Sequence, residues 1–288
     1  MKNKLHIGLK CFLLAYLLVS CSKLEIINNN SENIVVEGWI DNDGYPIVFL
    51  SRSIPISTEK LLVSDLSNYI ERWAKVSVSD GDTTVVLTGI FDKESFPPFY
   101  YTTSRIKGES GKTYTLKIET SDRLITSTTT IPPKAYVDSF SVKKGILNDT
   151  LYNVGAYVSQ QESNYFQFFI RDFTTDDGYY KSSYLGAYSN DDLPIEGCRL
   201  LAVNNYRRTF FVEDKYTTSY PRGTLLKIKI SAMEKSGYDF WQTFEKMLSL
   251  SRNPICPMYN NLPTNIIGGY GYWIGYGSTE YNIEIPLE

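Results

Sequence analysis

Histidine is almost missing from this 288-residue sequence, in which the only one is His6. Once a leader that contains His6 is removed, the remaining chain has no imidazole. That absence excludes Ser-His-Asp and Cys-His catalysis, and it also excludes zinc sites built from histidine. Chemistry that uses paired carboxylates, and calcium binding through oxygen atoms, stay open.

Long apolar runs are also missing. The longest, residues 11–19, is far shorter than the roughly 20 residues of a membrane-spanning helix. Lys2, Lys4 and Lys10 precede this run, which is the arrangement of a secretory signal. The run ends in Leu18-Val19-Ser20-Cys21, which resembles the lipobox of bacterial lipoproteins. We therefore predict that residues 1–20 are a lipoprotein signal peptide and that Cys21 carries a covalent lipid, with a plain signal peptide as the alternative.

An excess of basic residues is absent as well. Removing residues 1–20 takes away three lysines and no acidic residue, which leaves 26 basic and 32 acidic side chains and a net charge of −6. A chain of this charge without a basic run is not expected to bind nucleic acid. No glycine-rich phosphate-binding motif is present, and "DNDG", residues 41–44, predicts a turn because it lacks the later glutamate of a calcium loop. No metal and no cofactor other than the lipid is expected.

Cysteine is scarce, and beyond residue 21 only Cys198 and Cys256 remain. In an oxidising compartment these two allow a single intramolecular disulfide. On the chain-entropy model, closing a loop of about 60 residues would stabilise the fold by about 4 kcal/mol. Two separate buried thiols are the alternative.

The chain that follows Cys21 predicts an all-β fold. Residues 21–33 are rich in asparagine and predict a flexible tether. Residues 34–133 contain about seven short strand patterns separated by turn signals, which favours an immunoglobulin-like β-sandwich. Pro132-Pro133 ends the last of these strands and marks the predicted domain boundary.

A second β-rich domain is predicted over residues 134–288, with one interruption. Apolar residues recur at helical spacing between Ser236 and Leu250, and Ser236 is suited to cap this helix. The simplest role for the aromatic stripe on this helix is to pack against a sheet. The fold class is therefore mainly β, with one amphipathic helix near residues 236–250.

Two tyrosine-rich stretches are candidates for contact with a ligand or partner. The first lies in a segment poor in aliphatic residues, which is typical of an exposed loop. The second, "IGGYGYWIGYG" at residues 267–277, places tyrosines on one side of a strand as a stacking platform for a sugar or peptide, with plain packing as the alternative. The candidate residues are Tyr179, Tyr180, Tyr184, Tyr188, Tyr270, Tyr272 and Tyr276.

Several stretches together resemble one family. They are the lipobox, "NIVVEGWID" at residues 33–41, "SGKTYTLKIET" at residues 110–120, and "NPICPMYNNLPTNIIGGYGYW" at residues 253–273. The chain is similar to the Bacteroidetes outer-membrane lipoproteins known as domain of unknown function 4249. That resemblance implies a protein on the cell surface, beside a TonB-dependent receptor, with a role in nutrient capture, and the family has no established catalytic residues to transfer. Only Ser22, Lys23 and Glu25 follow the cysteine in place of an acidic run, so extracellular and periplasmic orientations both stay open.

Three functions follow as hypotheses. The first is a non-catalytic accessory or substrate-binding subunit of a TonB-dependent uptake system, anchored in the outer membrane and binding an oligosaccharide or peptide. The second is a structural or adhesive surface protein of the pilus type. The third is a hydrolase that uses carboxylates.

Overall fold

Most of the chain is built from β-strands in this computed structural model, which describes residues 33–53, 67–93, 95, 97–145, 150–174, 179–205, 218–250 and 262–287. Asn33–Glu288 forms one compact unit. The predicted signal peptide, Cys21 and tether lie outside the described residues. The prediction of a mainly β fold is confirmed.

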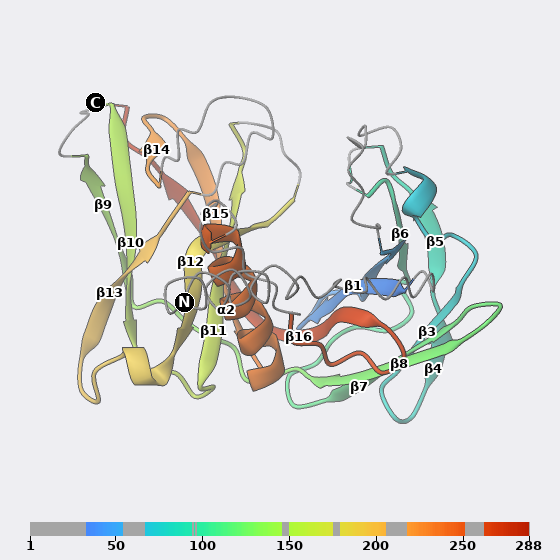
Figure 1. The fold of residues 1–288 in the computed structure, drawn as a ribbon. Helices are drawn as coiled ribbons and strands as arrows, with labels where there is room; N and C mark the ends of the chain where they lie inside the picture. The colour runs from blue at the N-terminus through green and yellow to red at the C-terminus, as the bar shows by residue number, and fades with distance from the viewer. Residues whose placement is uncertain are drawn as a thin grey trace, which may run out of the picture. The chain divides into compact units, whose positions relative to one another are not determined.

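The strands occur in the following order (Figure 1): β1 (Ile34–Asp41), β2 (Ile47–Arg52), β3 (Lys75–Ser79), β4 (Thr84–Val86), β5 (Thr88–Phe91), β6 (Phe99–Thr102), β7 (Thr113–Glu119), β8 (Leu124–Thr130), β9 (Ser139–Lys144), β10 (Leu151–Ser159), β11 (Tyr165–Asp172), β12 (Lys181–Ser189), β13 (Cys198–Val203), β14 (Tyr220–Pro221), β15 (Leu225–Met233) and β16 (Tyr270–Glu284). A short 3-10 helix, η2 (Asn190–Asp192), follows β12, and the helix α2 (Lys235–Leu250) follows β15.

Eight of these strands form one large sheet, in the order β12-β11-β15-β16-β1-β2-β6-β5. β16 joins its two halves. Its first residues pair in parallel with β1, from Val35 opposite Tyr270 to Asp41 opposite Tyr276. Its later residues pair antiparallel with β15, from Ala232 opposite Gly277 onward. The last strand of the chain therefore holds the N-terminal and C-terminal halves in a single sheet.

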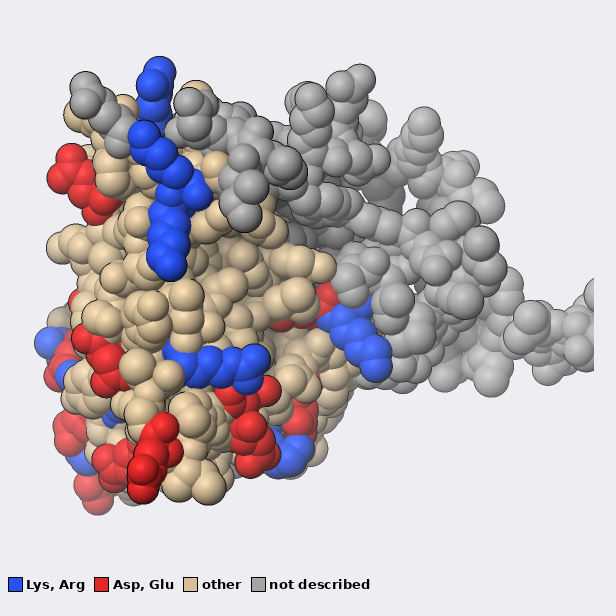
Figure 2. Space-filling model, turned by 90° about the vertical axis from the view of Figure 1, so that its left-hand side faces the viewer, with Lys and Arg blue, Asp and Glu red and all other residues tan. Residues whose placement is uncertain are grey.

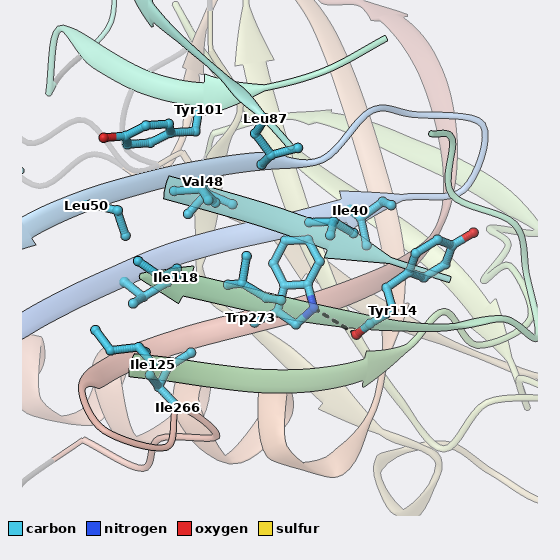
Figure 3. Close-up of a cluster of buried hydrophobic side chains, with 14 of the residues drawn as sticks. Ile40, Val48, Leu50, Leu87, Tyr101, Tyr114, Ile118, Ile125, Ile266 and Trp273 are labelled. Atoms are coloured by element: carbon cyan, nitrogen blue, oxygen red, sulfur yellow. Dashed lines mark hydrogen bonds between the residues drawn. The ribbon is translucent and has the colours of Figure 1, made fainter. Parts of the chain in front are cut away.

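A four-stranded sheet, β4-β3-β7-β8, packs on the N-terminal half and encloses the first core. Trp273 is fully buried there, and its Nε1 donates to the carbonyl oxygen of Tyr114 at 3.1 Å (Figure 3). Gly38 lies opposite Trp273 on β1, where a Cβ atom would come within 2.9 Å of the indole ring. Gly271 has a φ of 101°, and a side chain there would collide with the backbone of Val36. These glycines make room for the tryptophan and for the close approach of two strands.

A second four-stranded sheet, in which β10 pairs with β9, β13 and β14, packs on the C-terminal half and encloses a separate core. Alternation decides which side chains enter it: Tyr152, Val154, Ala156 and Val158 of β10 are buried, whereas Asn153, between the first two, is exposed. The outer surface of this sheet faces the viewer in Figure 2. Most of it is uncharged, basic side chains run over its upper part and across its middle, and acidic side chains gather toward its lower edge.

Pro132-Pro133, the predicted boundary, lies between Ile131 of the first core and Ala135 of the second, and the division into two domains stays a prediction. The C-terminal segment, however, contributes residues to the first core as well as to the second. Ile266 and Trp273 lie in the first core, among residues 34–131. The long-range return of β16 is not visible in the local sequence pattern.

The predicted helix at residues 236–250 is confirmed as α2, which begins one residue earlier, at Lys235. Ser236 is exposed in its first turn, and the carbonyl of Glu234 accepts from the backbone N–H groups of Gly237 and Tyr238. Residues 206–217 of the predicted second β-rich domain lie outside the described residues.

A candidate binding face

The face of the large sheet that points away from both cores carries α2, and we call it the helix-side face. Successive side chains of β16 alternate between the two faces, so Trp273 enters the first core while Tyr272, Ile274 and Tyr276 lie on the helix-side face. These three pack with Phe169, Met233, Phe240 and Trp241 into a third apolar cluster. The indole Nε1 of Trp241 donates to the hydroxyl of Tyr276 at 2.9 Å, which ties the helix to β16.

A buried lysine lies at the junction of the two sheet halves. The Nζ atom of Lys229 is 3.0 and 3.2 Å from the two carboxylate oxygens of Asp41, and the side chains are 8% and 23% exposed. The same Nζ lies 4.7 Å from the ring centre of Tyr180, 5.2 Å from Phe169 and 5.6 Å from Tyr276. Ring faces carry negative electrostatic potential, so all three stabilise the cation. We call this group the Lys229 cluster.

Hydrogen bonds extend the Lys229 cluster along β16. The hydroxyl of Ser278 donates to Asp41 at 2.5 Å, and the hydroxyl of Tyr180 donates to Glu280 at 2.6 Å. Burial raises the pKa of Tyr180 well above its ordinary value, and the bond to Glu280 adds to this effect. Burial alone would raise the pKa of Glu280, but the hydrogen bonds from Tyr180 and Lys227 outweigh it and leave that pKa lowered. The cluster therefore keeps Glu280 ionised and Tyr180 protonated near neutral pH.

A second acid, Glu37, lies on the same face of β1. The hydroxyl of Tyr272 donates to its Oε1 at 2.8 Å. Part of the Glu37 side chain is accessible to solvent, yet the protein packed around it displaces water and raises the pKa of the carboxyl, against the effect of the Tyr272 bond. Glu37 is thus an accessible hydrogen-bonding group beside the third apolar cluster.

Aromatic rings continue the helix-side face across the N-terminal half. Trp39 on β1 stacks on Phe49 of β2 at 5.9 Å between ring centres, and Phe49 contacts Tyr100 of β6 at 5.5 Å. Trp39 and Tyr100 are half-buried, so each keeps part of its ring accessible. A row of partly exposed rings offers flat apolar surface for a sugar ring or a peptide side chain.

Three of the seven predicted tyrosines meet on this face. Tyr180 and Tyr276 both lie against Lys229, so the two tyrosine-rich stretches of the sequence come together there. Tyr272 lies beside them in the third cluster. Next to Tyr180, the hydroxyl of Tyr179 donates to Asp92 in the connection between β5 and β6, at 2.5 Å.

The remaining predicted tyrosines lie elsewhere. Tyr188 packs against Phe166 and Phe168 of the second core. Tyr184 is partly buried in β12, and its carbonyl accepts from the side chain of Asn204. Tyr270 is exposed at the start of β16, at the far end of the first sandwich.

Sequence reasoning missed the charged residues of this face. Asp41 is the last residue of β1 and also the first residue of the predicted turn at residues 41–44, in which the N–H of Gly44 donates to the Asp41 carbonyl at 3.0 Å; its role in an ion pair was not predicted. Lys229 belongs to "LLKIKISAM", in which Lys227 and Lys229 alternate with Ile228 and Ile230. Lysines on one side of an otherwise apolar strand were the available signal, because such a side chain needs an acid on the neighbouring strand when it is buried.

The predicted disulfide has only one partner within the described residues. Cys198 is exposed on β13 and forms no disulfide with a described residue, and Cys256 lies outside them. Their pairing stays a prediction. Across the described ranges, no three His, Cys, Asp or Glu residues are grouped so as to hold a metal ion. No helix among these residues is long and apolar enough to cross a membrane.

Comparison with known proteins identifies a family. No curated protein is similar in sequence to this chain. Among solved structures, a segment of two fibronectin type-III domains from chicken tenascin is 9% identical; the match covers 70% of this chain and 91% of that one, with a TM-score of 0.20. The sequence profile described as "Domain of unknown function (DUF4249)" matches residues 22–282. The chain therefore belongs to the family of domain of unknown function 4249.

Proposed function

We propose that this protein is a non-catalytic binding subunit of a TonB-dependent nutrient uptake system, held in the outer membrane by a lipid on Cys21 and facing the outside of the cell. The observation that carries the proposal is the helix-side face, which holds paired charged groups together with the partly exposed rings of Trp39 and Tyr100. The ligand class that suits such a face is an oligosaccharide or a peptide.

The charged groups of the face support binding because they are held in place before any ligand arrives. Asp41 is paired with Lys229 and Ser278, and Glu280 with Tyr180 and Lys227. A site that is already ordered loses little conformational entropy on binding. Trp39, Tyr100 and Glu37 keep accessible atoms for stacking and for hydrogen bonds.

The arrangement of the acids favours binding over hydrolysis. Glu37 and Asp41 lie four residues apart on one strand, so their Cα atoms are about 13 Å apart. The carboxyl groups of a glycosidase pair are about 5–9.5 Å apart, so these two side chains would have to lean toward each other along the strand to reach that separation. Asp41 is moreover occupied by an ion pair, which leaves it unsuited to act as a base.

Copurification tests the proposal. The lipidated protein is extracted from native outer membranes in mild detergent, and we expect a TonB-dependent receptor to elute with it. Cys21→Ser is the matched variant and should leave the membrane fraction. Recovery of the wild-type protein without a receptor would contradict the proposal. Filaments would favour the adhesive alternative instead, and cleavage of polysaccharides or peptides would favour the hydrolase.

A further inference from the structure

Four large apolar side chains are exposed at one end of the first sandwich. Trp73 is 92% exposed, Ile267 73%, Leu124 55% and Tyr270 46%. They come from separate parts of the chain: the approach to β3, the start of β8, and the segment that leads into β16. The surfaces of soluble proteins carry isolated apolar residues, but four exposed apolar side chains in one region call for an explanation.

Strand registers place these residues at the same end. Tyr270 pairs with Val35 at the start of β1, and Ile267 bridges to Thr126 near the start of β8. Leu124 lies opposite Glu119 on β7, which in turn lies opposite Lys75, the first residue of β3. Trp73 precedes Lys75 by two residues. All four therefore surround the end of the sandwich at which β1 begins.

The chain enters the folded unit at this same end. Asn33 immediately precedes β1, and its carbonyl accepts from the backbone N–H of Ser53. Twelve residues separate Asn33 from Cys21, and whatever their conformation they span at most about 40 Å. A lipid on Cys21 therefore keeps this end, more than any other part of the unit, close to the bilayer.

We propose that this end is a membrane-contact surface, on which Trp73, Leu124, Ile267 and Tyr270 insert into the interfacial region of a phospholipid bilayer. The inference rests on the lipid anchor of the proposed function. Tryptophan and tyrosine favour the interface because the ring is apolar and its N–H or O–H stays hydrated. An anchored chain with exposed aliphatic and aromatic groups gains a second point of attachment there.

The contact with lipid is mainly apolar, because three basic groups near this end are already paired with acids. Arg52 is paired with Glu71 at 2.8 Å, Lys75 with Glu119 at 3.4 Å, and Arg123 with Asp122 at 2.6 Å. These three paired groups attract anionic lipid weakly. Arg72, next to Trp73, is exposed and forms no ion pair with a described residue, so it adds one available positive charge. Contact should therefore form on vesicles of neutral phosphatidylcholine and should depend little on salt.

Quenching of tryptophan fluorescence by brominated lipid tests the surface. The lipidated full-length protein is reconstituted into phosphatidylcholine vesicles with plain or brominated acyl chains. Trp73 is the reporter, because Trp241 and Trp273 are buried and Trp39 is half-buried. The difference in emission between the wild type and Trp73→Phe is the signal of Trp73. This signal should be about half as strong in brominated vesicles as in plain ones, since an interfacial ring lies within reach of the acyl chains.

A matched control comes from the opposite end of the same sandwich. Tyr45 is exposed in the turn between β1 and β2. In the Trp73→Phe background, Tyr45→Trp should add emission that brominated lipid leaves unchanged. Quenching at position 45 and not at position 73 would overturn the assignment of the membrane-facing end.

Vesicle flotation separates the two proposals. Failure of the wild-type protein to float with vesicles would contradict the lipid anchor, and with it this inference. Flotation with equal Trp73 emission in plain and brominated vesicles would overturn the contact surface alone. A third result would also overturn the membrane-contact surface: a copurified receptor protects Trp73 from quenching by iodide, and brominated lipid has no effect. The receptor would then be what covers this end.

Discussion

The two faces of the large sheet carry different side chains although they belong to the same strands. Toward the cores, β1 and β16 present Val36, Ile40 and Trp273, all fully buried. On the helix-side face the same strands present Glu37, Asp41 and Tyr276, with hydrogen bonds and ion pairs among the rings. One side therefore supplies stability by burial of apolar surface, and the other supplies positioned polar and aromatic groups.

The comparison separates residues whose loss should unfold the protein from residues whose loss should alter binding. In β16 the separation is between neighbours, since Tyr272 and Trp273 are adjacent but point to opposite faces. Variants on the two faces test whether stability and binding depend on different side chains.

Trp273→Ala should have the largest effect on stability. The substitution removes the largest fully buried side chain of the first core and its hydrogen bond to Tyr114. We expect the free energy of unfolding to fall by about 4 kcal/mol, as for other large-to-small core substitutions. Urea denaturation followed by circular dichroism measures this loss. A loss below about 1 kcal/mol would mean that the core face does not dominate stability.

Glu245 on α2 should make stability depend on pH. Its side chain is buried and accepts from Gln167 and from the backbone of Gly186. Burial raises the pKa of its carboxyl from 4.5 to about 7, against the effect of these bonds. The folded state therefore holds the proton more tightly than the unfolded state, and stability falls as pH rises from about 4.5 to 7, by about 3 kcal/mol in total.

Glu245→Gln is the matched variant for this pH effect. It keeps the acceptor oxygen but has no proton to lose, so its stability should fall less than that of the wild type between pH 4.5 and 8, with Glu37 as a remaining acid whose raised pKa acts in the same direction. Denaturant midpoints at several pH values make the comparison. If stability changed with pH in the same way in both proteins, another group would be the cause.

Lys229→Met should destabilise by about 2 kcal/mol, because Asp41 is left partly buried without its cation. Combining it with Asp41→Asn should recover part of the loss, since neither charge then remains. A double-mutant cycle in urea measures the coupling. Additive losses would show that the ion pair and the rings around it contribute little to the helix-side face.

Tyr179→Phe should have the smallest effect, less than about 1 kcal/mol, because the hydroxyl that it removes bonds to Asp92 at a largely exposed site. Thermal unfolding of the variant checks this value. A loss comparable to that of Lys229→Met would mean that the contact between Tyr179 and the β5–β6 connection is a major tie between the sheet halves.

Local patterns predicted much of the fold. Alternation in β1, β7 and β8, and the helical spacing that became α2, depend on neighbouring residues and are visible in one sequence. The sharing of β16 between two halves is not, because it depends on pairing with β1 more than 200 residues away. For the same reason the tyrosine stretches were found separately, while the Lys229–Asp41 pair that unites them was missed.

The most direct test of the account is the recovery of variants of the two surfaces on immobilised oligosaccharides and peptides. Trp39→Ala combined with Tyr100→Ala alters the helix-side face, and Leu200→Ala alters an exposed residue of β13 on the second sandwich. We predict that recovery of the helix-side variant, folded by circular dichroism, is about ten-fold lower, as expected for loss of central aromatic contacts, while recovery of Leu200→Ala equals that of the wild type. Equal recovery with all three proteins would contradict the claim that the helix-side face is the binding surface.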